Sequence, residues 1–470
     1  MKRQDPDNGL LDYLSNSPGA ARATDNAVRL LGEAGYEQWG ERDPWQPEAG
    51  SAFYVRRGAG GVIAVRVGSQ PVCETGFRIV AAHTDSPALK VKPRGIRRKA
   101  GGVYVPVEIY GGPIQSTWLD RELVLTGRAV VREASESLST RTFTTSQPCA
   151  VIPNLAIHLN REINKGFEYN AQDHLQARLS LPGESPQAGP AGADGGRDRT
   201  DGDRNAPGQS DRDDSREKND GGPPDPSDLL WNEIATALAC RASDIVSADV
   251  FLADPRGAQL LADGKTVVSG RIDNLAGCYS SLRGFLQSDN TRDTLVAVLF
   301  DNEEIGSRTA GGADSAFLES VLQRIAGGQP ADFARAAARS LLVSNDGAHA
   351  LHDSYSSKYD NDYAPVTGGG PVIKTNASYR YASSGEAVAI TREIAHELDI
   401  PLQYLAGRSD MRTGSTIGPF AWSRTGAVTV DLGIPMLAMH SIRETAQTDD
   451  VEALTRLITG LLGIREDRIP

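Results

Sequence analysis

From residue 228 to residue 463, short apolar runs alternate with segments in which apolar residues recur at helical spacing. This alternation limits the possible folds more than any other feature of the chain. The runs 244–253, 294–300, 340–346 and 427–435 have the length and composition of strands, and helical patterns lie between them. Such an order is typical of α/β domains. We therefore expect a mixed, largely parallel central sheet flanked by helices.

The first part of the chain has a different pattern. Between residues 51 and 131, short β-like runs are separated by turns rich in glycine and proline, which is the pattern of strands. The predicted strands are "SAFYVRR", "GVIAVRVG", "FRIVAAH", "VYVPVEIY" and "ELVLTGRAVV". The sequence thus indicates a β-rich first part followed by an α/β second part.

Residues 183–228 lie between these two parts. They carry twelve acidic and six basic side chains, and no Val, Ile, Leu, Met, Phe, Trp, Tyr or Cys. A segment of this composition cannot bury enough apolar surface to offset the entropy of the chain. We expect it to be a disordered acidic insertion with no catalytic part.

Charge and composition also limit the partners and the compartment. A net charge of −12 argues against nucleic acid, whose phosphates require a basic surface. The chain has no stretch of about 18 apolar residues and no apolar core of a secretory signal, so we expect neither a membrane span nor export. The four cysteines form no C-x-x-C pair, so we expect them to be free thiols, which fits a reducing cytosol. We expect a cytoplasmic protein.

Several side chains that can bind metals follow the apolar runs. They are His83, Asp85, Asp273, Glu303, Glu304, Asp346 and His440. Singly, each has an ordinary explanation: Asp273 could cap the helix that follows it, and His440 could be a core histidine. Parallel sheets, however, bind ligands beyond the carboxyl ends of their strands, which places the whole set at one edge of the sheet. Together these residues fit a hydrolase with two bound metal ions.

Two cations bound close together need a shared anion, and a carboxylate such as Asp273 can bridge them with its two oxygens. Mixed imidazole and carboxylate ligation is typical of zinc. Manganese and cobalt also bind such sites, so the residues alone do not fix the metal. We expect two divalent ions per subunit, with Zn²⁺ favoured and Mn²⁺ or Co²⁺ as alternatives.

The adjacent glutamates in "LFDNEEIGS", Glu303 and Glu304, should repel each other, and burial should raise their pKa values. In a metal site, one can ligate a metal while the other accepts a proton from a metal-bound water. We expect the two side chains to leave the strand in different directions, and one of them to titrate unusually high without metals. The alternative is an acidic pair that opens a helix and stabilises its dipole.

Long motifs occur in order over most of the chain. They are "AAHTDSPALKVKP", "IHLNREINKGFEYNAQDHL", "GRIDNLAG", "DNEEIGS", "SNDGAHALH", "GPVIKTNASYRYAS", "GSTIGP" and "AMHSIRE". Together they resemble the aspartyl aminopeptidase family, the M18 metallopeptidases. The resemblance implies an aminopeptidase that hydrolyses the N-terminal residue of peptides and favours Asp or Glu there.

The resemblance also implies a domain organisation. Residues 1–92 and 240–470 would form a catalytic metallopeptidase domain, and residues 93–239 an inserted β-rich dimerisation domain that contains the acidic insertion. Dimers would assemble into a tetrahedral dodecamer whose active sites face an inner chamber.

Individual roles follow from the resemblance as well. His83 and Asp346 would ligate one metal, Glu304 and His440 the other, and Asp273 would bridge both; Glu303 would be the general base that activates a metal-bridging water, and Asp85 would orient His83. The residues implied to contact substrate are His158 from a neighbouring subunit, His349, Lys374 and Tyr381. Lys374 is the candidate partner of an acidic first residue.

Three other functions are considered. A different two-metal hydrolase on the same scaffold, an amidase or deacylase, would cleave N-acyl substrates. A non-catalytic assembly protein would keep the fold for oligomeric packing, but the intact glutamate pair argues against it. A serine hydrolase is disfavoured because no G-x-S-x-G elbow surrounds Ser86.

Overall fold

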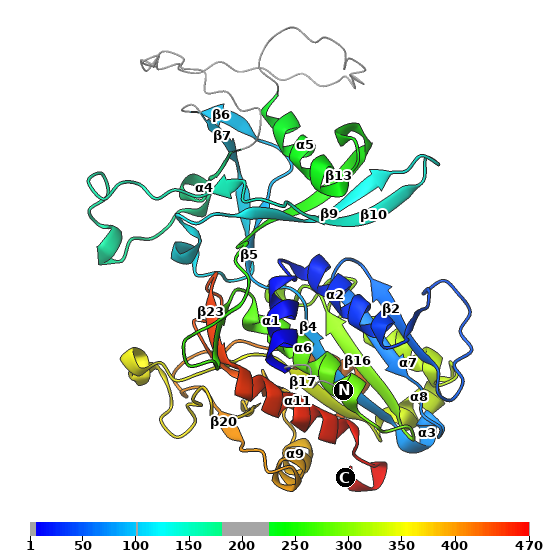
Figure 1. Ribbon diagram of the computed structural model, residues 1–470. Helices are drawn as coiled ribbons and strands as arrows, with labels where there is room; N and C mark the ends of the chain where they lie inside the picture. Colours follow the sequence, from blue (N-terminus) through cyan, green and yellow to red (C-terminus); the bar gives the residue numbers. More distant parts are fainter. Residues whose placement is uncertain (1–5, 100–101, 181–224, 470) are drawn as a thin grey trace, which may run out of the picture.

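The computed structural model describes residues 6–99, 102–180 and 225–469 (Figure 1). Most of the predicted disordered insertion, residues 183–224, lies outside the described residues. Of the remaining residues, Asp225 is the N-cap of helix α5 (Pro226–Leu238) and residues 226–228 form its first turn, so the prediction was wrong for these four. The Asp225 carboxylate accepts a hydrogen bond from the Ser227 N–H at 2.8 Å and caps the helix, and Pro226 is well suited to its first turn.

A nine-stranded sheet forms the centre of the molecule. Its strands, in spatial order, are β1 (Glu37–Gln38), β2 (Ala52–Arg57), β3 (Gly61–Arg66), β16 (Thr294–Phe300), β4 (Phe77–His83), β17 (Leu341–Asn345), β21 (Val428–Gly433), β19 (Val372–Lys374) and β20 (Gln403–Leu405). Five of the eight neighbouring pairs run parallel and three antiparallel. The predicted mixed, largely parallel sheet is confirmed.

Helices cover both faces of this sheet (Figure 1). One face packs against α1 (Pro6–Ser15), α2 (Ala20–Glu33), α6 (Ile272–Gln287), α9 (Gly385–Glu397) and α11 (Thr448–Leu462). The other face packs against α3 (Val72–Thr75), α7 (Phe317–Ile325), α8 (Pro330–Ala337) and α10 (Gly418–Thr425). Along β16, Leu295 and Leu299 belong to the first core and Val298 to the second. A strand buried on both faces reads as a continuous apolar run, which explains "TLVAVLF".

A second body, which we call the β-rich unit, lies beside the central sheet and has its own core (Figure 1). Its larger sheet is antiparallel and orders β10 (Leu138–Thr144), β9 (Val124–Arg132), β13 (Ile245–Ala253), β5 (Ala88–Val91) and β8 (Val107–Tyr110). Its smaller sheet orders β11 (Ala150–Val151), β12 (Ala177–Leu179), β7 (Gly102–Val105) and β6 (Arg97–Lys99). Helices α4 (Ala171–His174) and α5 complete the unit.

Two details of the β-rich unit differ from the sequence-based expectation. The run "VYVPVEIY" is not one strand: it divides at Pro106 into β7 and β8, which belong to different sheets. Proline has no N–H for a strand ladder, so it favours such a break. In addition, β5 and β13 pair with this unit although both lie outside the predicted limits 93–239.

A small third sheet lies near the mouth of the central sheet. It orders β14 (Gln259–Leu260), β15 (Thr266–Ser269), β23 (Glu444–Gln447), β22 (Pro435–Leu437) and β18 (Ala348–His349). Within the ranges that the structure describes, no helix has both the length and the apolarity needed to cross a membrane.

Candidate active site

Three neighbouring parallel strands end at the same edge of the central sheet. β4 ends at His83, β16 leads to Glu303 and Glu304, and β17 leads to Asp346. The structure therefore brings these side chains together, as the rule for parallel sheets predicts. Asp273 joins them from the first turn of α6, and His440 from the segment between β22 and β23.

Asp273 lies between the two histidines. Its Oδ1 is 3.6 Å from His83 Nε2, and its Oδ2 is 3.3 Å from His440 Nε2. His83 Nε2 is also 3.4 Å from Asp346 Oδ1, and His440 Nε2 is 3.4 Å from Glu304 Oε2. Each oxygen of Asp273 thus faces a separate group of one histidine and one further carboxylate.

The backbone of Asp273 excludes the simplest alternative explanation of this residue. Its ψ of 107° is not helical, and no hydrogen bond from a backbone N–H to its carboxylate is found among the described residues. Its own N–H donates to Glu444 Oε2 at 3.0 Å. Asp273 therefore does not cap α6, and its carboxylate is free to bind a cation.

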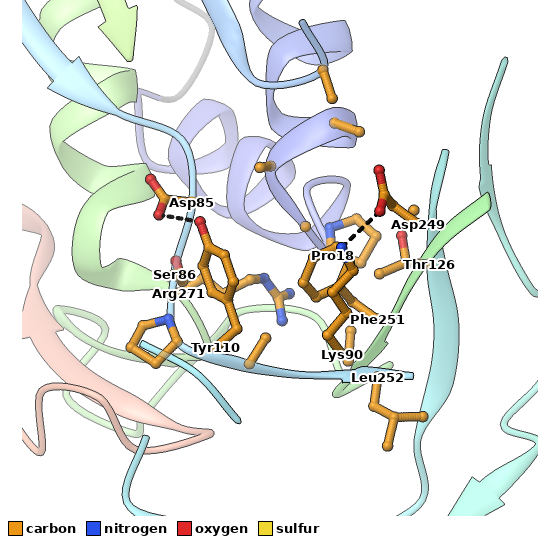
Figure 2. A pocket seen from close by; sticks show the side chains of 18 of the residues that line it. Pro18, Asp85, Ser86, Lys90, Tyr110, Thr126, Asp249, Phe251, Leu252 and Arg271 are labelled. Atoms are coloured by element: carbon orange, nitrogen blue, oxygen red, sulfur yellow. Dashed lines mark hydrogen bonds and ion pairs between the residues drawn. The ribbon is translucent and has the colours of Figure 1, made fainter. Parts of the chain in front are cut away.

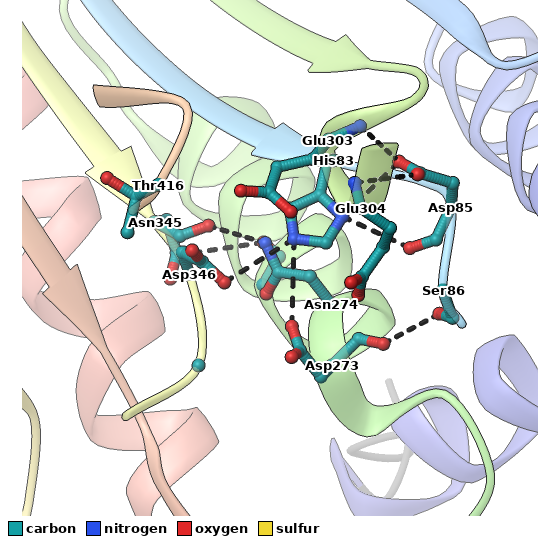
Figure 3. A network of polar contacts seen from close by, with 12 residues as sticks. His83, Asp85, Ser86, Asp273, Asn274, Glu303, Glu304, Asn345, Asp346 and Thr416 are labelled. Carbon is teal, nitrogen blue, oxygen red and sulfur yellow. Dashed lines mark hydrogen bonds and ion pairs between the residues drawn. The ribbon is translucent and has the colours of Figure 1, made fainter. Parts of the chain in front are cut away.

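Asp85 supports the site from behind (Figure 3). Its carboxylate accepts hydrogen bonds from the N–H of Glu303 (3.0 Å), the N–H of Glu304 (3.1 Å) and the hydroxyl of Tyr110 (2.8 Å). His83 Nδ1 is closer to the Asp85 carbonyl oxygen, at 3.1 Å, than to its carboxylate, at 3.5 Å. Asp85 thus fixes the imidazole through its main chain and the glutamate pair through its side chain.

The two glutamates lie beyond the end of strand β16 (Thr294–Phe300). They lie in a 3-10 turn, η4 (Glu303–Ile305), which follows Asn302 in the left-handed conformation (φ 62°). Asparagine tolerates this conformation better than most residues do. The turn separates the directions of the two side chains: Glu304 approaches His440, whereas no hydrogen bond to the Glu303 carboxylate is found in the described part of the chain.

The site concentrates negative charge in a buried region. Burial, with a contribution from nearby Asp346, raises the pKa of Glu303 to about 8, although His83 opposes the shift. Burial and the charge of Asp273 raise the pKa of Glu304 well above its usual range. Both glutamates are therefore shifted, where one was expected to be. Each would be ionised at neutral pH only with a positive charge close by.

These residues fit divalent metal ions. His83, Asp273 and Glu304 offer ligand atoms that lie within 4.8 Å of one another. Two buried carboxylate oxygens, Asp273 Oδ1 and Glu304 Oε1, have no hydrogen-bond partner among the described residues. Unpaired buried oxygens are costly, and mixed carboxylate and imidazole ligation suits zinc.

Three further residues support the predicted ligands, a role that the sequence did not predict for them. The buried Glu444 carboxylate accepts from the N–H of Asp273 (3.0 Å) and the N–H of His440 (2.7 Å). Ser86 donates its hydroxyl to the Asp273 carbonyl at 2.6 Å, and Tyr110 holds Asp85. Of the three, only Glu444 can be found from the sequence, because it lies four residues after His440 in the motif "AMHSIRE". Nothing in the sequence places Tyr110 of β8 beside Asp85.

The residues predicted to contact substrate have different surroundings. Lys374 is buried at the end of β19, where Nζ donates to the carbonyl oxygens of Asp346 (3.0 Å) and Gly347 (3.2 Å) and lies 3.6 Å from Asp346 Oδ2. Tyr381 is also buried, with its ring centroid 5.4 Å from Lys374 Nζ. His349 is exposed on β18, and His158 is exposed in a turn of the β-rich unit.

Comparisons with known proteins show which family the chain belongs to. A family model described as aminopeptidase I zinc metalloprotease (M18) matches residues 13–461. A probable M18 family aminopeptidase 2 of Ectopseudomonas mendocina is 38% identical over 96% of each chain, and one of Stutzerimonas stutzeri is 37% identical over 97% of each chain.

Solved structures show the same fold. Ape4, in a complex with Nbr1, superposes with a TM-score of 0.85 at 33% identity, over 97% of this chain and 84% of that chain. An M18 aminopeptidase of Thermotoga maritima superposes with a TM-score of 0.78 at 20% identity, over 98% of this chain and 97% of that chain. The resemblance seen in the motifs is confirmed: the chain belongs to the M18 family and is an aminopeptidase, a zinc-metallopeptidase hydrolase.

Proposed function

We propose that the chain is a dinuclear-metal aminopeptidase that removes the first residue of peptides, favouring Asp or Glu, with Glu303 as the general base. The position of Asp273 carries this proposal. Its two oxygens face His83 Nε2 and His440 Nε2 separately, which is the arrangement needed to share one carboxylate between two cations. His83 and Asp346 would hold one ion, and Glu304 and His440 the other.

When bound, the metal ions would polarise the scissile carbonyl and lower the pKa of the attacking water. Glu303 would accept the proton of that water at its carboxylate and then deliver it to the departing amine. The backbone of Glu303 is anchored by Asp85, so its side chain can pivot from a fixed point. Tyr381, or His158 of a neighbouring subunit, would donate a hydrogen bond to the developing oxyanion.

The proposal is tested with the zinc-loaded protein and a panel of peptides that differ at the first residue, beside the same peptides with N-acetyl caps. We expect cleavage of free-amine peptides only, because the buried carboxylates would attract a free α-ammonium group. Among these peptides, those that begin with Asp or Glu should be cleaved fastest. Repeating the panel with Mn²⁺ and Co²⁺ identifies the metal preference. Cleavage of the capped peptides alone would contradict the proposal and would indicate a deacylase.

Lys374 is the residue that we expect to favour an acidic first residue. Replacing it with methionine should lower kcat/KM for Asp and Glu peptides about tenfold or more relative to Ala peptides. The reason is the loss of the charge-assisted contact between the Lys374 ammonium group and the side-chain carboxylate of the first residue. The ratio of kcat/KM values between the two peptide classes measures this effect.

The contacts of Lys374 with Asp346 support a second role, because the ammonium group also balances the charge of that predicted ligand. An equal loss of kcat/KM for all peptides, together with a loss of bound zinc, would mean that Lys374 positions Asp346 and does not select substrate. The Lys374→Arg variant is the matched control, since it keeps the charge.

We also propose that the β-rich unit, with limits near residues 88 and 253, mediates dimerisation, and that the dimers form a tetrahedral dodecamer. The solved relative mApe1 of S. cerevisiae is described as a dodecamer and supports this proposal only through the shared fold. Within this chain, Leu155, Ile157 and Leu159 are exposed on either side of His158, at 58%, 47% and 75%. Such clustered apolar side chains are typical of an interface between subunits.

Two variants of this turn should separate assembly from catalysis. Leu159→Asp should lower the native mass measured by light scattering, because a charge would be buried at the contact between subunits. His158→Ala should keep the native mass and lower kcat. Leu138→Asp, at another exposed leucine (59%) at the start of β10, is the matched control and should keep both. An unchanged native mass for Leu159→Asp would contradict this interface.

A further inference from the structure

A cavity lies close to the predicted metal site but is separate from it. Its volume is about 280 Å³, and its lining includes Asp85, Ser86 and Glu444 but none of the five predicted metal ligands. Further parts of the wall come from the start of α2 and from strands β5, β8, β9 and β13 (Figure 2). The cavity thus lies where the β-rich unit meets the central part of the molecule, a place where small-molecule sites are frequent.

Apolar side chains form much of the wall. Pro18, Trp118, Phe251, Leu252 and Ile442 all line the cavity. Its volume is just below the range of roughly 300–1,000 Å³ that is usual for ligand pockets. A compact apolar group, such as one aromatic ring, therefore suits this space better than a peptide does.

One cation in the lining has no ion-pair partner among the residues that the structure describes. Lys90 and Arg128 both bind Asp249, at 2.7 Å and 2.9 Å. Arg271, in contrast, donates only its Nε–H, to the Ser17 carbonyl oxygen at 2.9 Å, and no other hydrogen bond or ion pair of its guanidinium is found in the described ranges. Figure 2 shows this guanidinium pointing into the space that the labelled side chains surround.

The acidic groups of the lining are already occupied. Asp85 accepts three hydrogen bonds, and Glu444 accepts from two backbone N–H groups. Asp301 accepts from the N–H groups of Gly60 and Asn302. Arg271 is therefore the charged group of this cavity that a ligand could satisfy, and its two Nη atoms form a fork that matches a carboxylate.

We propose that this cavity binds a small carboxylic acid with a compact apolar body. The carboxylate would bind the Nη atoms of Arg271, and the apolar body would pack against Phe251 and Trp118. A multiply charged anion such as phosphate fits less well, because Asp85, Asp301 and Glu444 would repel it and the apolar walls would offer it nothing.

The bound acid would contact residues that hold the metal site without occupying that site. Asp85 anchors the two glutamates, Glu444 anchors Asp273 and His440, and Ser86 binds the Asp273 carbonyl oxygen. Because the lining contains none of the five predicted metal ligands, the acid and a ligand at the metal centre should be able to bind at the same time.

Titration calorimetry on the zinc-loaded full chain tests this proposal. An amino-acid hydroxamate saturates the metal centre first, so that the zinc ions cannot capture the added carboxylate. The probes are 3-phenylpropionate, its neutral analogue 3-phenylpropan-1-ol, and inorganic phosphate. We expect 3-phenylpropionate to bind once per subunit and at least about tenfold more tightly than either other probe.

Two variants identify the site. Arg271→Met should remove the difference in Kd between the acid and the alcohol, whereas Arg29→Met, on the exposed face of α2, should keep it. Ala20→Leu should weaken the binding of both aromatic probes about tenfold by filling the cavity. If Arg271→Met does not fold, this variant still tests whether the probes bind in this cavity. Loss of acid binding in the presence of hydroxamate, equal binding of phosphate, or unchanged binding in Ala20→Leu would overturn the proposal.

Discussion

Glu303→Gln is expected to lower kcat by about 10²–10⁴-fold, the usual contribution of a general base. Glutamine keeps the size of the side chain but cannot accept a proton from the attacking water. The backbone anchor, from the Glu303 N–H to Asp85, does not involve the altered group and should persist. Steady-state kinetics on free-amine peptides measures the loss, and metal analysis and light scattering of the same sample should show unchanged zinc content and native mass.

The control is Glu452→Gln, which makes the same change on the exposed face of α11 and should leave kcat as it was. Two results would contradict the assigned role. Unchanged turnover in Glu303→Gln would mean that another group accepts the proton. A loss of zinc in parallel with the loss of activity would mean that Glu303 is a metal ligand.

The sequence was sufficient for those parts of the site that lie next to strands. His83, Glu303 and Asp346 each follow an apolar run, and the rule for parallel sheets predicts that they lie at one edge of the sheet. The role of Asp273 is harder to predict from the sequence, because helix capping explains an aspartate at that position equally well. Only the non-helical ψ of Asp273 and the positions of its two oxygens separate these explanations.

The supporting residues could not be predicted, because they act across long distances in the sequence. Tyr110 reaches Asp85 only after β5 and β8 have paired in the β-rich unit, and Glu444 reaches Asp273 across 171 residues. The limits of that unit were missed for a similar reason. Strand β13 looks like a member of the α/β alternation, yet its register with β9 assigns it to the antiparallel sheet. Periodicity identifies a strand but does not specify which neighbour it pairs with.

Removing the metal ions with a chelator is expected to abolish activity and to make stability depend on pH. In the metal-free protein, burial raises the pKa values of both Glu303 and Glu444 to about 8, from an ordinary value of 4.5. The folded state then holds protons that the unfolded state has lost. The contribution of these two groups to the free energy of unfolding should therefore be largest below about pH 4.5, fall as the pH rises to about 8, and change little above that, by up to roughly 5 kcal/mol per group.

Calorimetry in chelator at pH 6 and pH 8 measures this effect, and we expect Tm to be lower at pH 8 by at least about 2 °C. Zinc should remove the decrease, because deprotonated ligands bind metal better as the pH rises. Metal-free Glu303→Gln is the matched variant: it lacks one titrating group, so its Tm should fall less between the two pH values. An identical fall of Tm with and without zinc would contradict the assignment of these carboxylates to a metal site. A smaller fall in metal-free Glu303→Gln, together with normal zinc content in the loaded variant, would show that the two adjacent glutamates divide their work: Glu304 binds the cation, and Glu303 carries the proton.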